Sequence, residues 1–386
     1  MKKKSEILPN NICFITHQLE HLHNVSVSIS FKAGSLYESK YNNGISHLVE
    51  HLFFRQLSDL SQESLYFNMQ KIGGEITGKT YCDYVTFSIN VIPQYLYDAL
   101  DIMLKFFDDF EWSNSIILKE KEVVLRQIEN KVYSYNQWID SIYFDNTKYT
   151  LPIMGTKKTV KSLTAFEINS WKKEYFSPAN SCVTFTGNFS NEFYDFLKQK
   201  LSIINNFGKK QDSIIEIAPN FTKRNSDNYL TVINADSKLS EVVVLFDIKN
   251  SFDYESVKLI TSILSDGCGS KLSMIMREKY QLTDDIFTQL TSYCGFHRYS
   301  ISYTDNQMID LDNCQKLNED YVLSDFILDI LPSDPIEKAK KYKKILINDL
   351  IKIANEIFVK ENISFIIETS INPSNIKSFL DNLMYH

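Results

Sequence analysis

The chain has 386 residues, 44% of them hydrophobic and 23% charged, and its 48 acidic and 41 basic residues give a net charge of −7. This composition is typical of a globular protein with a large core, and it excludes a wholly disordered chain. The negative charge disfavours nucleic acid as the main partner, because phosphate binding requires a basic surface. At roughly 100–200 residues per domain, the length predicts two domains.

The six cysteines are scattered without CxxC pairs, so we expect free thiols in a reducing compartment rather than a disulfide framework. Basic residues at 2–4 are followed by the polar segment 5–11, where a signal peptide would need an apolar run. No stretch approaches the roughly 18 uncharged apolar residues of a membrane span. These features predict a cytoplasmic protein without a membrane-spanning helix.

Strands and helices alternate through the first half of the chain. Residues 25–31 alternate apolar with polar side chains, which is typical of a half-buried strand. Apolar residues at every third or fourth position predict the helices. The predicted strands are 25–31, 84–91 and a strand with its turn at 182–188, and the predicted helices are 45–54, 61–71, 94–107, 113–132, 163–175 and 192–201.

The second half repeats this order. Its predicted elements are a strand at 242–247, a helix at 257–264, a strand at 298–303 and a strand at 365–367. The repeat aligns Val27 with Val243 and Asn180 with Asn362, at offsets of 216 and 182, so the second copy is about 34 residues shorter (216 − 182).

This repeat predicts an α+β fold. We expect two homologous α/β domains, each a mostly antiparallel sheet with helices packed on it, duplicated within one chain. The domains are expected at 1–204 and 229–386, joined by a polar linker at 205–228.

His47, Glu50 and His51 form an HxxEH motif in the helix predicted at 45–54. Residues three and four apart share one face of a helix. Two imidazoles on that face can bind one zinc ion, and Glu50 then lies beside the open coordination position, where a carboxylate can take a proton from water. HxxEH is the inverted zincin pattern. The motif is short, and a surface helix without metal is the alternative.

The sequence around this motif resembles the pitrilysin/insulinase family of zinc metallopeptidases, the inverzincins. The resemblance rests on segments 32–38, 44–54, 73–80, 120–126, 155–156, 175–180 and 187–188. The matching segments lie close together over the first 200 residues, and the resemblance is weaker in the second half of the chain. It looks most like short-chain members, such as the mitochondrial processing peptidase subunits and bacterial peptide-processing peptidases. The resemblance implies one zinc ion, a peptide substrate, and a second family subunit, in a heterodimer or a homodimer, that completes a chamber.

By this resemblance, His47 and His51 bind zinc and Glu50 activates water. The family's third ligand is a Glu that follows another acid by seven residues. Here the first acid is Glu120, and the ligand position holds Gln127. Its neutral amide oxygen is a poorer zinc ligand than a carboxylate. This departure from the family implies that either zinc binds weakly here or the partner subunit carries the better site.

Glu129, which follows Glu122 by seven residues, is the alternative third ligand. It is rotated by about 200° from Gln127 on an ideal helix, so the apolar face of the helix would have to slip. Gln127 is therefore the favoured ligand.

Two further positions are assigned by resemblance to substrate binding. Arg277 matches an Arg that contacts substrate near the transition state, whereas the Tyr that accompanies it in the family is replaced by Asp284. Thr77 replaces an Asn that holds the substrate backbone, and its hydroxyl can still form a hydrogen bond. Alternatively, Arg277 only pairs with a carboxylate.

The sequence thus predicts a zinc-dependent endopeptidase subunit that processes a peptide or an unfolded precursor inside a chamber formed with a second subunit. Glu50 would activate the water, and Arg277 or its partner counterpart would stabilise the oxyanion. The alternative is a non-catalytic binding subunit of a heterodimeric processing peptidase, which Gln127 and Asp284 favour.

Overall fold

The computed structural model describes two compact units of the chain. The described residues are 2–130, 135–144, 148–205, 207–211, 230–234, 241–249, 251–267, 269–279, 286–293, 296–303, 344–359 and 362–369, with the single residues 374 and 377. Those up to 211 belong to the first unit and those from 230 onward to the second. Of the predicted linker, residues 206 and 212–228 lie outside the described residues, and the predicted domain boundaries stay a prediction.

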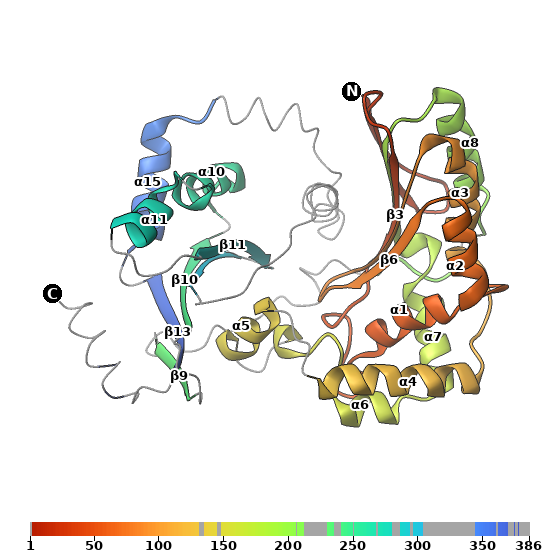
Figure 1. Ribbon diagram of the computed structural model, residues 1–386, viewed down its shortest axis with the longest axis horizontal. Helices are drawn as coiled ribbons and strands as arrows, with labels where there is room; N and C mark the ends of the chain where they lie inside the picture. The colour runs from red at the N-terminus through yellow and green to blue at the C-terminus, as the bar shows by residue number, and fades with distance from the viewer. Residues whose placement is uncertain are drawn as a thin grey trace. The chain divides into compact units, whose positions relative to one another are not determined.

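The first unit is built on a six-stranded sheet (Figure 1), whose strands follow the order β1-β2-β8-β3-β7-β6. Its strands are β1 (Lys2–Ile7), β2 (Cys13–Gln18), β3 (Val25–Phe31), β6 (Glu75–Thr80), β7 (Val85–Val91) and β8 (Ser181–Gly187). All neighbours are antiparallel except β2 and β8, which run parallel. A separate short hairpin consists of β4 (Gln56–Leu57) and β5 (Leu60–Ser61).

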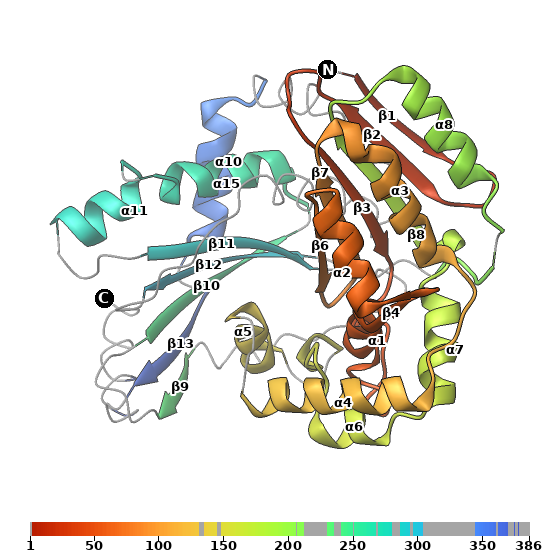
Figure 2. The same ribbon diagram turned by 45° about the vertical axis from the view of Figure 1, so that its right-hand side comes forward.

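The helices of the first unit include all six that the sequence predicts. They are α1 (Ile45–Arg55), α2 (Gln62–Lys71), α3 (Leu96–Leu104), α4 (Asn114–Glu129), α5 (Tyr135–Tyr143), α6 (Lys157–Ser162), α7 (Ala165–Tyr175) and α8 (Asn191–Ser202). Helices α1, α2 and α3 lie against one face of the sheet, and α4 crosses α1 (Figures 1 and 2). The predicted helix 94–107 is shorter because its two ends are single 3₁₀ turns.

Helix α1 is fixed to the sheet by an apolar stripe. Ile45, Leu48, Val49, Leu52 and Phe53 recur at helical spacing and are each at most 1% exposed. The ring of Phe53 packs among four aromatic rings at centroid distances of 5.1–5.4 Å. The opposite stripe of α1, which carries the HxxEH side chains, is thereby held in one orientation.

The second unit contains a five-stranded sheet in the order β11-β12-β10-β13-β9 (Figure 2). Its strands are β9 (Leu230–Asn234), β10 (Glu241–Lys249), β11 (Ile286–Tyr293), β12 (Phe296–Tyr303) and β13 (Ile363–Thr369). The pairing is antiparallel except between β13 and β9. The helical segments are α10 (Tyr254–Ser265), α11 (Lys271–Ser273) with a following π-helical stretch (Met274–Lys279), and α15 (Ile347–Ile357).

The two sheets have the same topology, which confirms the predicted duplication and the mostly antiparallel fold. The order β9-β13-β10-β12-β11 repeats β2-β8-β3-β7-β6, with the single parallel pair in the same place. Of these strands, β2, β6, β9 and β11 were not predicted. They lie toward the sheet edges, and the sequence EITGKT of β6, for example, lacks strict apolar alternation.

An asparagine makes the same two hydrogen bonds in both units. Nδ2 of Asn180 donates to the carbonyl oxygen five residues before it (2.7 Å) and to that of Lys32, which follows β3 (2.9 Å). Nδ2 of Asn362 donates to the carbonyl oxygen five residues before it (2.9 Å) and to that of Asp247 in β10 (2.6 Å). Each side chain therefore ties the end of a helix to the central strand of its sheet.

The predicted repeat alignment is wrong by one residue at its start. The registers of β8 with β3 and of β13 with β10 place Phe31 and Phe246 at equivalent positions, at an offset of 215. Val27 therefore corresponds to the residue before Val243, and the difference in length becomes 33 residues (215 − 182). The error arose because apolar residues run continuously through β10, so that alternation does not fix which of them face the helices.

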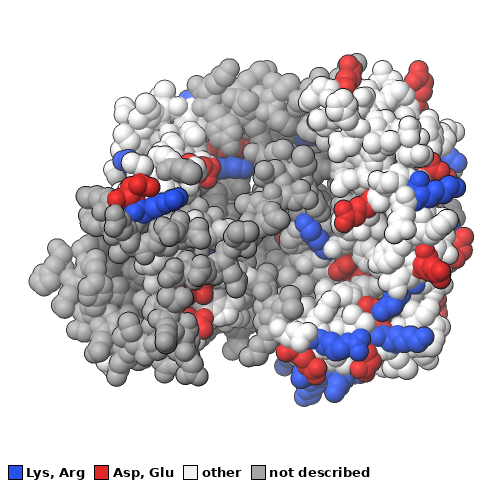
Figure 3. All heavy atoms as spheres, viewed as in Figure 1, with Lys and Arg blue, Asp and Glu red and all other residues white. Residues whose placement is uncertain are grey.

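Within the described part of the chain, no helix is both long and apolar enough to cross a membrane. On the face of the first unit that Figure 3 shows, acidic and basic side chains are interspersed.

Candidate metal centre

His47, Glu50 and His51 meet on the solvent side of α1. Each offers a ligand atom, and these atoms lie within 4.8 Å of one another. The side chains are 14%, 9% and 18% exposed, respectively, so the centre is largely buried but reachable. Among the described residues, this is the single group of His, Cys, Asp and Glu side chains placed to hold a metal ion.

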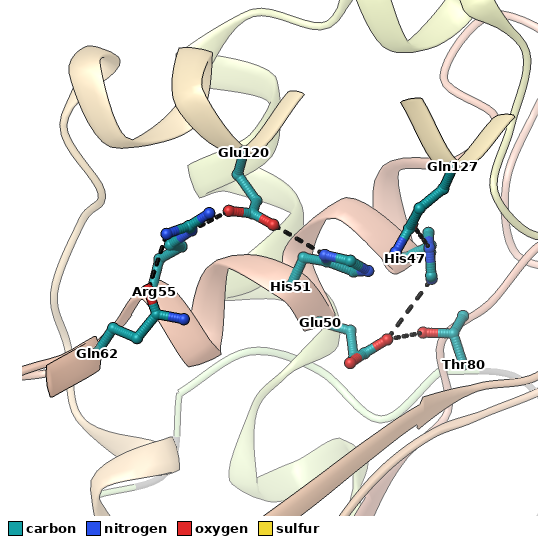
Figure 4. A network of polar contacts seen from close by, with 8 residues as sticks. All are labelled: His47, Glu50, His51, Arg55, Gln62, Thr80, Glu120 and Gln127. Carbon is teal, nitrogen blue, oxygen red and sulfur yellow. Dashed lines mark hydrogen bonds and ion pairs between the residues drawn. The ribbon is translucent and has the colours of Figure 1, made fainter. Parts of the chain in front are cut away.

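Helix α4 brings the two other predicted residues to this centre (Figure 4). Gln127 lies with Oε1 3.2 Å from Nε2 of His47, and Glu120 lies with Oε1 2.9 Å from Nδ1 of His51. A spacing of seven residues is close to two helical turns, so both side chains project from the same face of α4. Glu129 instead pairs with Lys157 (Oε1–Nζ 3.0 Å) and is 54% exposed. Gln127, and not Glu129, therefore stands beside the histidines.

The Glu120 carboxylate is held between two donors. One oxygen accepts from Nδ1 of His51 and the other from Nε of Arg55. Burial raises the pKa of Glu120, but these hydrogen bonds outweigh it and hold the pKa below its ordinary value. Arg55 is itself bound by Gln62 (Nη1–Oε1 2.8 Å). Arg55 was not predicted, although its position four residues after His51 places it on the same helix face.

Strand β6 supports Glu50 from the other side. Thr80 donates from Oγ1 to Oε2 of Glu50 at 3.1 Å. A Cβ atom at Gly78 would lie 2.5 Å from Oε1 of Glu50, so only glycine leaves room for this carboxylate. Because side chains alternate along a strand, Thr77 projects from the face of β6 opposite to Gly78 and Thr80. Neither Gly78 nor Thr80 was predicted, although both lie in the family-like segment 73–80.

The second predicted substrate group lies in the second unit. Arg277 is 52% exposed, with Nε 3.7 Å from Oε1 of the adjacent Glu278. Asp284 lies outside the described residues.

Comparison with known proteins agrees with these features. A family model described as insulinase (peptidase family M16) matches residues 14–157, and one described as peptidase M16 inactive domain matches residues 162–320. The chain is 25% identical over 190 residues to the uncharacterized zinc protease YmxG of Bacillus subtilis, which covers 48% of this chain and 46% of that protein. It is 21% identical over 257 residues to the probable mitochondrial-processing peptidase subunit beta of Arabidopsis thaliana, which covers 66% and 48%, respectively.

The matches thus span about half the length of these curated relatives. Among solved structures, a protease from Helicobacter pylori has the same fold, with a TM-score of 0.77 at 16% identity over 95% of this chain and 99% of that chain. A duplicated α+β fold with HxxEH on its first long helix defines the class of inverted zincins. The chain belongs to the insulinase family, peptidase family M16.

The family implies zinc, and the side chains of the centre fit this metal. Because Nδ1 of His51 donates to Glu120, the Nε2 atom of that ring keeps a lone pair for a metal, as is usual for metal-binding histidines. Nδ1 of His47 is buried, makes no hydrogen bond and lies 3.5 Å from Oε2 of Glu50. The oxygen of Gln127 adds a third donor to the two imidazole nitrogens, a set that suits zinc, although Gln127 contributes no negative charge.

Proposed function

We propose that the chain is a zinc-dependent endopeptidase subunit that processes a peptide or an unfolded precursor. The observation that carries this proposal is the position of Glu50, between His47 and Thr80 and on the same face as His51. This is the position of a general base next to a metal-binding pair.

The residues of the centre have distinct roles in this reaction. Bound zinc would supply a Lewis acid for the scissile carbonyl. Glu50 takes the proton from the attacking water and passes it to the leaving amine, while Thr80 keeps the carboxylate oriented. Glu120 fixes the ring of His51. Arg277 would stabilise the oxyanion in the site of a paired subunit.

The edge strand β6 favours an extended substrate. It is the last strand of its sheet, and within the described residues no strand pairs with its outer edge. A peptide can add to such an edge by backbone hydrogen bonds. Thr80, at the end of β6, holds the Glu50 carboxylate, so a peptide that pairs with this edge also passes Glu50. Peptides and unfolded chains have extended segments whose backbone groups are unpaired, and we therefore propose them as substrates.

A second subunit of the same family would complete a chamber around the peptide, in a heterodimer or a homodimer. Relatives named as beta subunits of mitochondrial-processing peptidases support a subunit role. Peptide maturation and a cytoplasmic location belong to the same proposal.

A non-catalytic binding subunit is the second candidate, and Gln127 favours it. A neutral third ligand weakens zinc binding, so this chain would then bind peptides for an active partner. Elemental zinc analysis of the purified chain, together with cleavage of a fluorogenic peptide library, separates the two candidates. Zinc in the chain and cleavage that Glu50→Gln abolishes support the endopeptidase. A folded chain that holds no zinc, alone or in its complex, supports the binding subunit.

A further inference from the structure

Helix α1 begins without a capping side chain of its own. Gly44 occupies the N-cap position with φ 94°, and no side chain at this position bonds the first turn. A Cβ atom at Gly44 would lie 2.6 Å from the carbonyl oxygen of Met154 and 2.8 Å from Cα of Gly155. This close approach excludes the Ser, Thr, Asp or Asn that usually caps a helix.

Glu38, six residues earlier, takes over this function. It is 1% exposed. Its Oε2 accepts from the backbone amide of Gly44 (2.7 Å) and its Oε1 from that of Ser46 (2.9 Å). Asn43 adds a third hydrogen bond from Nδ2 to Oε2 (2.9 Å). Two amides that lack a partner within the helix are thereby satisfied.

The Glu38 carboxylate also places a negative charge at the N-terminus of α1, close to His47. The N-terminus of a helix carries a partial positive charge, and the first turn of α1 contains no acidic residue. His47 lies in this turn, so a dication bound to it would be repelled by the helix end. The hydrogen-bond partners of Glu38 are the backbone amides of Gly44 and Ser46 and the side chains of Asn43 and Ser46. All of them can donate, which is the pattern expected around an ionised carboxylate. Burial raises the pKa of Glu38, and these hydrogen bonds oppose the rise.

We propose that Glu38 is a positioning residue for the metal centre: it caps α1 from outside the helix and neutralises its positive end, so that His47 is held for a metal ion. The part that concerns the metal rests on the proposed function, whereas the capping of α1 does not. The test therefore has one measurement without metal and one with it.

The variant is Glu38→Gln, which keeps the shape of the side chain but removes its charge. Asn42→Ala is the matched control, because it removes the hydrogen bonds that Asn42 accepts from Ser39 in the same loop and none of the bonds that Glu38 accepts. Amide hydrogen exchange of the metal-free proteins compares Gly44 and Ser46 with Leu52 at the other end of α1. Titration with zinc chloride then gives the metal affinity of each protein.

In Glu38→Gln, exchange at the first turn should accelerate at least about tenfold while the far end of α1 is unchanged, and zinc affinity should fall roughly three- to tenfold. The control should change zinc affinity by less than about twofold. Uniform acceleration along α1, no acceleration, or an equal loss of affinity in the control would overturn the proposal. If the wild-type chain binds no zinc, the proposed function fails, and the exchange measurement still decides whether Glu38 caps α1.

Discussion

The imidazole of His51 donates from Nδ1 to Oε1 of Glu120 across 2.9 Å, and this bond connects the HxxEH helix to α4 (Figure 4). A carboxylate behind a metal-binding histidine fixes the tautomer and the orientation of the ring and increases its basicity. Arg55 holds the second oxygen of Glu120, so the orientation is set by two bonds.

Replacing Glu120 by Ala should weaken zinc binding roughly 10–100-fold, the usual cost of losing such a supporting carboxylate. Competition with a chromophoric chelator measures this affinity. Glu122→Ala, an exposed position on the same helix, is the matched control and should leave the affinity unchanged. Equal affinities of the two variants would show that Glu120 does not support a metal ligand.

Replacing Gln127 by Glu should increase zinc affinity by at least about tenfold, because a carboxylate at 3.2 Å from the His47 ring would add a negative charge to a set of neutral nitrogen ligands. The same chelator competition applies. Glu129→Gln should have no effect, since Glu129 pairs with Lys157 at the surface. A large loss of zinc from Glu129→Gln would instead make Glu129 the ligand and require α4 to rotate.

Glu50→Gln should reduce peptide cleavage roughly 10²–10⁴-fold while zinc stays bound, because the general base is lost and the histidines remain. Turnover of a fluorogenic peptide and zinc content are measured on the same sample. Thr80→Val should cause a smaller loss, since it removes only the hydrogen bond that orients the carboxylate. Cleavage that survives in Glu50→Gln would exclude Glu50 as the base.

Lys172 should make the protein more stable as the pH rises above 8. Burial lowers its pKa to about 8 from 10.5, although nearby Asp109 and Asp108 oppose this. Nζ donates to the carbonyl oxygen of Phe110 at 2.5 Å. Between these two pKa values the unfolded chain binds more protons than the folded chain, so the free energy of unfolding increases with pH, by about 1–2 kcal/mol from pH 8 to 9.5.

Urea denaturation at several pH values measures this slope, and Lys172→Met provides the comparison. The variant should lack the Lys172 contribution, so the difference in unfolding free energy between the two proteins should change over this pH range. A difference that stays constant from pH 7 to 9.5 would contradict the lowered pKa.

Local periodicity in the sequence predicted the helices and strands that have a clear apolar pattern. Elements and site residues whose structure depends on long-range contacts were not predicted. The apolar stripe of α1 and the alternation in β3 predicted those elements, whereas β1, with the sequence KKKSEI, is a strand because it pairs with β2. In the centre, the resemblance to the insulinase family indicated Glu120 and Gln127. Thr80 and Gly78 were missed because their roles depend on how close β6 comes to α1.

The hydrogen bonds of Asn180 and Asn362 separate the architecture of a unit from its chemistry. Both copies contain the asparagine that ties a helix to the central strand, whereas α10, the counterpart of α1, has no histidine. The fold of a unit therefore does not depend on metal-binding side chains. Substitutions that abolish the centre of the first copy should yield folded proteins that bind no metal at α1.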